Sequence, residues 1–429
     1  MKRYCIIGAG PSGLAAARAL DRAGLSFDVY ERHADVGGIW DASNARTPIY
    51  ESAHFISSRT QSAFDDFPMP DDYPDYPSWR QILDYIRAFA DKYDLRKHIR
   101  FDTSVDRVER DGDGWLIYLG GTDVRRYDGV IAAVGHNWHA VIPQYPGSFD
   151  GEAYHTIDYR SGAELAGKRV LIVGGGNSGC DIACDAATRA RESWISLRRG
   201  YHFIPKHVFG QPTDAFFHHG PQIPNWMAPT LLSALLRILV GDLRRFGLPK
   251  ADHPPLSSHP IMNTQLLHHL AHGDIAAKPD VAELRGRTVR FTDGSEIEPD
   301  VILWATGYRP TIPCFEAGGI VLAESGEDLY LNVFSNDYPG LYIIGFFETA
   351  GAAYPIVSKQ SALLAAVLEA AETPDSRGTR AFEEAMAKPR KLNGGMHYAS
   401  SPRHKFYVQF EEYLKETERV RKRVEGAAR

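Results

Sequence analysis

Two glycine-rich segments of the same design constrain the fold of this 429-residue chain more than any other feature. They read GAGPSG over residues 8–13 and GGGNSG over residues 174–179. Each segment follows a short apolar stretch and precedes a stretch with helical patterning, after which a second apolar stretch begins. Strand, glycine turn, helix and strand within about 30 residues is the order of a Rossmann-type βαβ unit. The sequence therefore predicts an α/β protein with two dinucleotide-binding domains.

In the first unit we expect a strand over residues 2–7, a helix over 14–23 and a strand over 27–30. Glu31 then falls 18 residues after Gly13, at the end of the second strand. A carboxylate at this position accepts hydrogen bonds from ribose hydroxyls and disfavours a 2′-phosphate. FAD and NAD both fit the first loop, whereas NADP does not.

In the second unit we expect a strand over residues 169–173, a helix over 180–189 and a strand over 194–197. Arg198 takes the position that Glu31 has in the first unit. A guanidinium there can pair in a bidentate manner with a 2′-phosphate, which favours NADPH. The alternative is that Arg198 is an ordinary surface arginine.

Composition excludes several other classes of protein. A formal net charge of −6 gives no electrostatic support for binding nucleic acid. The apolar stretch 231–240 is interrupted by Arg237 and is shorter than the roughly 20 residues that a bilayer crossing takes. The histidine groups lack carboxylate or cysteine partners at ligand spacing, so we expect no metal site. These groups are His218-His219, His268-His269 and His272.

The four cysteines form no Cys-x-x-Cys pair, so we expect reduced thiols and a cytoplasmic protein. Two nucleotides on one chain imply hydride transfer from NADPH to a flavin. Disulfide reductases of this design need a redox-active cysteine pair, which the chain lacks. Oxygen or a soluble acceptor is left to take the electrons.

Three further segments carry a family resemblance. The segment 149–159 (FDGEAYHTIDY) resembles the F-x-G-x-x-x-H-x-x-x-(Y/W) fingerprint of flavin-containing monooxygenases, and it lies just before the second glycine loop. The segment 305–308 (ATGY) resembles the A-T-G-Y motif of that family, and 38–40 (GIW) resembles its G-L-W segment. The resemblance extends from residue 1 to about residue 365.

The resemblance implies a single-component, NADPH-dependent oxygenase of small molecules. In that family the reduced flavin reacts with O2 to a C4a-(hydro)peroxyflavin, which oxygenates soft nucleophiles such as amine nitrogen or sulfide sulfur. Bound NADP+ protects this adduct from water. The partners expected are therefore FAD, NADPH, O2 and a small nucleophilic substrate, and a homodimer is left open.

The resemblance also implies which residues contact the cofactors. For FAD these are Gly8, Gly10, Ser12, Gly13, Glu31 and Trp40, with Val105 at the adenine and Gln360 near the isoalloxazine. For NADPH they are Gly174, Gly176, Asn177, Ser178, Gly179 and Arg198. His155 of the fingerprint is expected to act structurally, through hydrogen bonds that link the two domains, and not in proton transfer.

One segment departs from the family pattern. Many members carry an asparagine before the S-D-F-P motif that contacts the flavin and NADP+, and here Ile56 takes its place. Ser57, Ser58 or His54 could supply the missing hydrogen bond and are the catalytic candidates. Otherwise the oxygen adduct leaks peroxide.

The sequence predicts an NADPH domain inserted in the FAD domain. The expected bounds are 1–165 for the first part of the FAD domain, 166–299 for the NADPH domain, and 300–429 for the second part with C-terminal helices. We interpret the charged tail helix over 411–429 as a solvated face, and expect the poorly patterned region 205–260 to line the substrate pocket.

Three other functions remain as alternatives. The first is Baeyer–Villiger oxygenation of ketones, whose fingerprint ends in Trp-Pro or Trp-Asp, where this chain has Tyr159-Arg160. The second is an NADPH oxidase or reductase that does not oxygenate a substrate. The third is a redox-sensing protein without catalysis.

Overall fold

The computed structural model describes residues 2–219, 227–322, 328–396, 398 and 406–428. The chain divides into two compact units, and each has its own parallel sheet. The first unit comprises Met1–Asn44, Ser57–His136 and Thr311–Arg429, and the second comprises Ala45–Ile56 and Asn137–Pro310. The chain thus enters the second unit twice, once briefly and once for the full length of a domain.

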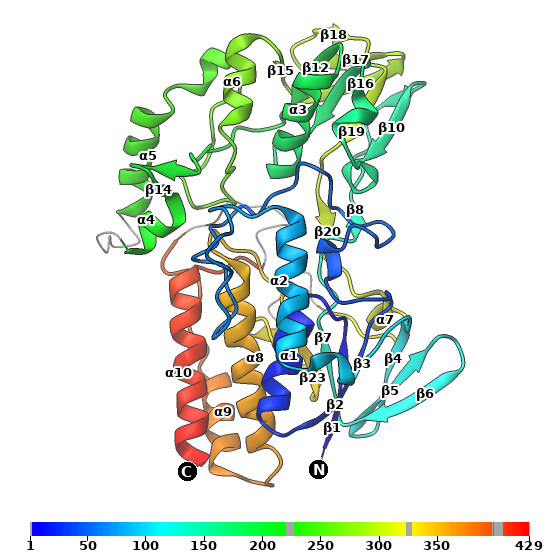
Figure 1. Ribbon diagram of the computed structural model, residues 1–429, viewed down its shortest axis with the longest axis vertical. Helices are drawn as coiled ribbons and strands as arrows, with labels where there is room; N and C mark the ends of the chain where they lie inside the picture. The colour runs from blue at the N-terminus through cyan, green and yellow to red at the C-terminus, as the bar shows by residue number, and fades with distance from the viewer. Residues whose placement is uncertain (1, 220–226, 323–327, 397, 399–405, 429) are drawn as a thin grey trace. The chain divides into compact units, whose positions relative to one another are not determined.

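A seven-stranded sheet forms the centre of the first unit (Figure 1). Its order is β21 (Leu329–Tyr330), β22 (Phe334–Ser335), β23 (Leu341–Ile343), β7 (Gly129–Ala132), β1 (Arg3–Ile7), β2 (Ser26–Tyr30) and β3 (Ile99–Arg100). The strands from β23 to β3 run parallel, and β21 and β22 add antiparallel. Every residue of β7 and four of the five in β1 are buried, as expected for a parallel sheet that is covered on both faces.

Helices and a small antiparallel sheet complete the first unit. Helix α1 packs against α8, and α8, α9 and α10 lie side by side in Figure 1. Helix α2 begins with a capping box in which Ser78 and Gln81 satisfy each other's backbone amides. The antiparallel sheet β4–β5–β6 packs the fully buried Trp115 against the core of the parallel sheet. The bounds are α1 (Pro11–Arg22), η1 (Gly38–Trp40), α2 (Trp79–Lys92), η2 (Leu95–His98), β4 (Val105–Asp111), β5 (Gly114–Leu119), β6 (Asp123–Tyr127), α7 (Pro313–Glu316), α8 (Ala353–Ala370), α9 (Arg377–Met386) and α10 (Phe410–Ala428).

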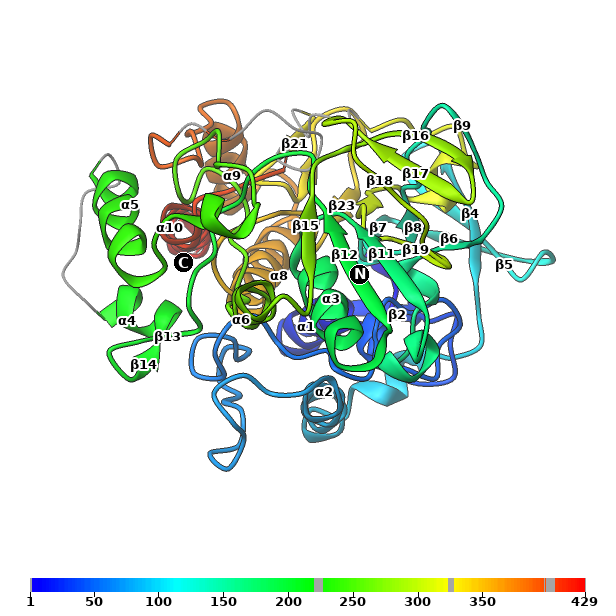
Figure 2. The same ribbon diagram turned by 90° about the horizontal axis from the view of Figure 1, so that it is seen from above.

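The second unit is built on a five-stranded parallel sheet. Its order is β10 (Glu152–His155), β19 (Val301–Trp304), β11 (Arg169–Val173), β12 (Glu192–Ser196) and β15 (Ala276–Lys278). Helix α3 (Asn177–Arg189) packs against β11 and β12 and against α6 (Gln265–His272), and Figure 2 shows these elements together. A four-stranded sheet lies in the same unit, in the order β18 (Glu296–Ile297), β17 (Thr288–Phe291), β16 (Val281–Gly286) and β9 (Gly147–Phe149).

The region without clear patterning, 205–260, contains short elements of the second unit. Helix α5 buries Leu232 and Leu236 in an apolar cluster with Ile204 and Met262. No helix in the described part of the chain combines the length and the apolarity that a bilayer crossing needs. The remaining elements of this unit are β8 (His139–Ala140), η3 (Thr156–Asp158), η4 (Gly162–Leu165), β13 (His207–Val208), β14 (Gln211–Pro212), α4 (Thr213–His219), α5 (Ala228–Leu239), η5 (Leu243–Phe246) and β20 (Tyr308–Arg309).

The predicted fold class is confirmed, whereas the interpretation of the C-terminal helix as a solvated face is wrong. Helix α10 packs against α8 and α9 and buries a stripe of side chains that faces them. Tyr413, Thr417, Val420 and Val424 are at most 1% exposed, and their spacing of four, three and four residues places them on one helix face. The abundant charges occupy the other faces of α10, where they form ion pairs along the helix.

The buried stripe of α10 leads to a stability prediction. Val420→Ala removes two methyl groups from a fully buried position and should lower the free energy of unfolding by about 2 kcal/mol. Lys422→Ala, at an exposed position of the same helix, should change it by less than about 0.5 kcal/mol. Urea unfolding of the FAD-loaded protein measures both, and equal effects would contradict the buried stripe.

Candidate functional site

The first glycine loop joins β1 to α1 by a turn that only glycine permits. Gly8 has φ of +102°, and its amide donates to the Tyr30 carbonyl at 2.8 Å. A Cβ at Gly13 would lie 1.9 Å from the Gly8 carbonyl oxygen, so a side chain here would push the helix away from the strand. Gly10 is the N-cap of α1; no side chain caps the helix and its first turn holds no acidic residue. The amide groups of the first turn are therefore suited to hold a phosphate.

Glu31 connects this loop to the end of β2. The carboxylate is buried and accepts from the Ala9 amide at 2.7 Å and from the His33 amide at 2.9 Å. It therefore lies against the glycine loop itself, where its remaining lone pairs can accept from ribose hydroxyls. Trp40 ends the short helix η1, whose first residue, Gly38, packs against Gly10.

Two other residues expected at FAD differ in their surroundings. Gln360, on α8, is fully buried: its Oε1 accepts from the Gly345 amide at 3.0 Å, and its Nε2 donates to the Tyr413 hydroxyl at 2.8 Å. The structure brings Gln360 and Ser12 together at Gly345, because a Cβ on that glycine would lie 2.2 Å from the Ser12 Oγ. Val105 begins β4 and is partly buried.

The second glycine loop repeats the construction of the first between β11 and α3. Gly174 has φ of +118°, and its amide donates to the Ser196 carbonyl at 2.9 Å. A Cβ at Gly179 would lie 2.1 Å from the Gly174 carbonyl oxygen. Gly176 is the N-cap of α3, which again has no capping side chain and no acidic residue in its first turn. A methyl group added at Gly176 would meet no atom of the described residues within 4 Å, so the loop is open where a phosphate would approach.

Arg198 lies two residues beyond the end of β12 and is exposed. Within the described part of the chain its guanidinium forms no hydrogen bond or ion pair. It lies near Tyr145, whose phenol pKa it lowers against the larger effect of burial. A cation without a carboxylate partner beside a nucleotide loop fits a 2′-phosphate. The two loops therefore fit the two nucleotides that the sequence predicts.

Side chains of α3 form hydrogen bonds with the short stretch 45–56 of this unit and with the segment before α6. Asn177 accepts from the Met262 amide at 2.9 Å, so it orients the segment before α6 as well as the start of α3. Ser178 lies near the Tyr50 hydroxyl and lowers the pKa of that phenol against the larger effect of burial. Tyr50 also donates to Asp181, and Ser52 donates to Asp185. Sequence reasoning missed both aspartates, although two acidic residues four apart on a helix of small apolar residues are a detectable signal.

The fingerprint 149–159 has structural roles within the second unit. His155 is 2% exposed; its Nε2 donates to the Gly307 carbonyl at 3.1 Å, while its Nδ1 accepts from the Ile157 amide. This arrangement fixes the neutral tautomer, and burial lowers the pKa of the imidazole. Both partners belong to the same unit as His155, so its hydrogen bonds act inside that unit. Tyr159, fully buried, donates to Asp185 at 2.9 Å.

The three catalytic candidates have different environments. His54 is exposed in the second unit, and its Nδ1 donates to the Ser52 carbonyl at 2.9 Å. In the first unit, Ser57 accepts from Ser62 at 2.7 Å, and Ser58 is buried, 3.3 Å from the Thr60 hydroxyl. Their roles toward the cofactors stay predictions.

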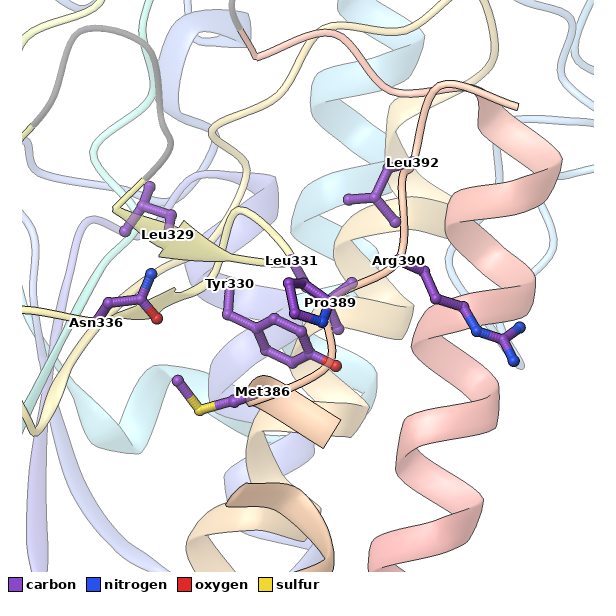
Figure 3. A pocket seen from close by; sticks show the side chains of 8 residues that line it. All are labelled: Leu329, Tyr330, Leu331, Asn336, Met386, Pro389, Arg390 and Leu392. Carbon is purple, nitrogen blue, oxygen red and sulfur yellow. The ribbon is translucent and has the colours of Figure 1, made fainter. Parts of the chain in front are cut away.

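A cavity of about 160 Å³ lies in the first unit, apart from these residues (Figure 3). Within the described residues the Tyr330 hydroxyl has no hydrogen-bond partner. The cavity is lined by Leu329, Tyr330, Leu331, Asn336, Met386, Pro389, Arg390 and Leu392, none of which was predicted to bind a cofactor.

The described residues include no group of three or more His, Cys, Asp and Glu side chains that could hold a metal ion.

Fold and loops define a protein that holds two dinucleotides, and comparison with known proteins identifies its family. The model of the flavin-binding monooxygenase-like family matches residues 1–422. Flavin-containing monooxygenase 5 of Mus musculus is 32% identical over 437 residues, which cover 94% of this chain and 79% of the mouse protein. Dimethylaniline monooxygenase [N-oxide-forming] 2 of Rattus norvegicus is 32% identical, with 84% of this chain and 72% of the rat protein covered.

Among solved structures, cyclohexanone monooxygenase with bound ε-caprolactone has a TM-score of 0.74 at 18% identity, with 100% of this chain and 98% of that chain covered. At this identity the likeness concerns the fold alone. The chain belongs to the flavin-binding monooxygenase-like family. It is a flavin-dependent monooxygenase whose cofactors are FAD and NADPH.

Gly179 and Gly176 of the second loop differ in the space around them, so substitution to alanine should affect stability at one and nucleotide binding at the other. Gly179→Ala places a Cβ against the Gly174 carbonyl and should lower the free energy of unfolding by about 3 kcal/mol or more. In Gly176→Ala the added Cβ would contact no atom of the described residues, so the free energy of unfolding should stay within about 1 kcal/mol of that of the parent. The methyl group would instead stand where the nucleotide approaches, so NADP+ should bind about tenfold more weakly. Thermal unfolding and calorimetric NADP+ titration separate the two. Unchanged NADP+ affinity in Gly176→Ala would show that the nucleotide does not approach this glycine.

Proposed function

We propose that the first unit holds FAD at residues 8–13 and the second unit holds NADPH at residues 174–179. Each loop leads into a helix without a capping side chain, and a charged residue follows the next strand. Glu31 suits the ribose of FAD, and Arg198 suits the 2′-phosphate of NADPH. The discontinuous FAD domain and the inserted NADPH domain of the sequence prediction are part of this proposal.

We infer that the enzyme transfers one atom of O2 to a soft nucleophile, an amine nitrogen or a sulfide sulfur of a small molecule. When bound, NADPH would supply a hydride to the flavin, and the reduced flavin would pass the electrons to O2, whose second atom would leave as water. The protein residues bind and orient: the glycine loops hold the pyrophosphates, Glu31 and Arg198 select the nucleotides, and Ser57, Ser58 or His54 provides a hydrogen bond near the flavin. The relative from Rattus norvegicus, named as N-oxide-forming, supports nitrogen as one target.

One observation carries the choice of oxygen as electron acceptor. The chain presents two nucleotide loops, but its four cysteines are all free and buried. Burial raises the pKa of the Cys180 and Cys184 thiols, which keeps them protonated and unreactive. Electrons that reach the flavin therefore have no disulfide to reduce in this chain.

Ketone oxygenation is less well supported than oxygenation of nitrogen or sulfur. The fingerprint ends in Tyr159-Arg160, and the Tyr159 hydroxyl is used in a hydrogen bond to Asp185. The likeness to cyclohexanone monooxygenase does not alter this conclusion, because at 18% identity it concerns the fold alone.

An NADPH oxidase that releases peroxide is the second candidate function, and Ile56 favours it. Ile56 replaces the family asparagine, and it packs against the apolar cluster of Ile204, Leu232, Leu236 and Met262. A side chain in such a cluster offers no hydrogen bond, so stabilisation of the activated oxygen would depend on the neighbouring polar residues.

Three further assignments concern the localisation, the substrate and the oligomeric state. We propose a cytoplasmic protein, on the support of four free cysteines in a chain of this length. We propose that the enzyme acts on a small molecule and uses O2 as its second substrate. A homodimer is compatible with the family assignment.

Product analysis tests the proposed function directly. Purified enzyme with FAD and NADPH is offered a set of tertiary amines and sulfides, and NADPH, O2, peroxide and oxygenated product are quantified. We expect one N-oxide or sulfoxide per NADPH for the best substrate. Full conversion of NADPH into peroxide with every compound would contradict oxygenation and favour the oxidase.

Nucleotide selection should depend on Arg198. Arg198→Ala removes the guanidinium that pairs with a 2′-phosphate and should raise KM for NADPH about 10- to 100-fold while leaving KM for NADH within about twofold. Arg191→Ala, at an exposed position before the other end of β12, is the matched control and should leave both constants unchanged. Equal effects of Arg198→Ala on both nucleotides would refute the phosphate role.

A further inference from the structure

Residues 45–56 form a short strap that belongs to the second unit although both flanking segments belong to the first. The strap contacts the helix that follows the NADPH loop through polar side chains. Because Asn44 precedes it and Ser57 follows it, the strap is joined covalently to the first unit at both ends. These ends adjoin Trp40 and Ser57, residues expected at the flavin.

The first contact of the strap with α3 is made by Tyr50. Its hydroxyl donates to the Asp181 Oδ2 at 2.9 Å. Ser178 lies near the same hydroxyl and lowers the pKa of the phenol against the larger effect of burial. The other oxygen of Asp181 accepts from the Asn263 Nδ2 at 2.7 Å. Both oxygens of this carboxylate are therefore used within the protein, although burial raises its pKa and so opposes its charge. The hydrogen bonds from Tyr50 and Asn263 act in the opposite direction and lower the pKa.

The second contact lies one helical turn further along α3. Ser52 donates to the Asp185 Oδ2 at 2.6 Å, and the buried Tyr159 of the fingerprint donates to the same oxygen at 2.9 Å. The Glu51 amide donates to the carbonyl of Arg160, the residue that follows the fingerprint, at 2.8 Å, so a backbone hydrogen bond also joins the strap to this part of the chain. The strap is thus fixed to α3 and to the fingerprint together.

The position of these contacts along α3 gives them a specific consequence. Ser178, Asp181 and Asp185 lie at spacings of three and four residues, on one face of a helix whose N-cap is Gly176. Ser178 is itself part of the second glycine motif. A nucleotide at the N-terminus of α3 would therefore act on the turn directly before Asp181, which accepts the hydrogen bond of the Tyr50 hydroxyl.

We propose that Tyr50 and Asp181 are positioning residues that couple nucleotide occupancy of the second glycine loop to the conformation of the strap, and so to Ser57 and Ser58. This inference rests on the proposed function, since it takes NADP+ as the nucleotide of the second loop. It assigns to the strap a role beyond connecting two parts of the first unit. Bound NADP+ reduces the mobility of the first turn of α3, and the hydrogen bond between Tyr50 and Asp181 reduces the mobility of the strap in turn.

Hydrogen exchange with mass spectrometry tests the coupling without turnover. FAD-loaded enzyme is compared with and without saturating NADP+, and exchange is followed in peptides that cover 45–56. We expect NADP+ to slow exchange of the Glu51 and Ala53 amides, which donate to Arg160 and Tyr50 carbonyls. In Tyr50→Phe, which keeps the ring, that slowing should fall to less than about a third of its parent value.

A kinetic measurement on the same variants separates coupling from simple loss of stability. Tyr50→Phe should lower the anaerobic rate of flavin reduction at saturating NADPH about tenfold, while Kd for NADP+ changes less than about threefold. Tyr154→Phe is the matched control: it also removes a phenol-to-carboxylate hydrogen bond in the second unit, that to Glu164, and should change neither quantity. If Tyr50→Phe does not retain FAD, Ser52→Ala is measured in its place.

The outcomes distinguish this inference from the proposed function. Parent enzyme that binds NADP+ and shows no slowing in the strap overturns the coupling and leaves the function standing. Tyr50→Phe that behaves as Tyr154→Phe in both measurements shows that its hydrogen bond is only structural, which also overturns the coupling. Parent enzyme that does not bind NADP+ overturns the proposed function and the coupling with it.

Discussion

The close approach of a glycine to the strand before it is the constraint on which the rest of this structure depends. Gly13 lies against the Gly8 carbonyl and Gly179 against the Gly174 carbonyl, at distances that leave no space for a Cβ. Each helix therefore begins directly beyond the edge of its sheet, with the amides of its first turn uncapped. Both helix N-termini are therefore suited to hold an anion, and a chain with FAD and NADPH as cofactors and no cysteine pair is suited to pass electrons from NADPH through flavin to O2.

In the proposed assignment the second loop holds a nucleotide, and α3 must also keep its position against the rest of the unit; different faces of α3 suit these two tasks. The N-terminus is open at Gly176. One side carries Asp181 and Asp185, whose hydrogen bonds hold the strap and the fingerprint tyrosine, Tyr159. Both carboxylates are partly buried, which is costly for a charged group, so their presence on a helix of small residues indicates a demand for orientation that alanine would not meet. The fingerprint thus has a physical basis as the support of the nucleotide helix.

Much of this could be predicted from the sequence, because a backbone conformation that only glycine adopts leaves a local pattern. The glycine loops, and Glu31 and Arg198 at the strand ends, follow from spacing within one βαβ unit. The partners of Asp181 could not be predicted, since Tyr50 lies 131 residues away in the chain and nothing local indicates the pairing. The prediction of a solvated face for α10 is wrong for a different reason. Charged residues of this helix outnumber the buried residues of the stripe around Val420, although the helical spacing of that stripe is present in the sequence.

The central claim is that each glycine loop holds one nucleotide. A crystal structure of the enzyme grown with FAD and NADP+ tests it most directly. The account predicts the FAD pyrophosphate at the N-terminus of α1 with its ribose on Glu31, and the NADP+ pyrophosphate at the N-terminus of α3 with its 2′-phosphate on Arg198. Density for either nucleotide away from its loop, or a 2′-phosphate that makes no contact with Arg198, would contradict it.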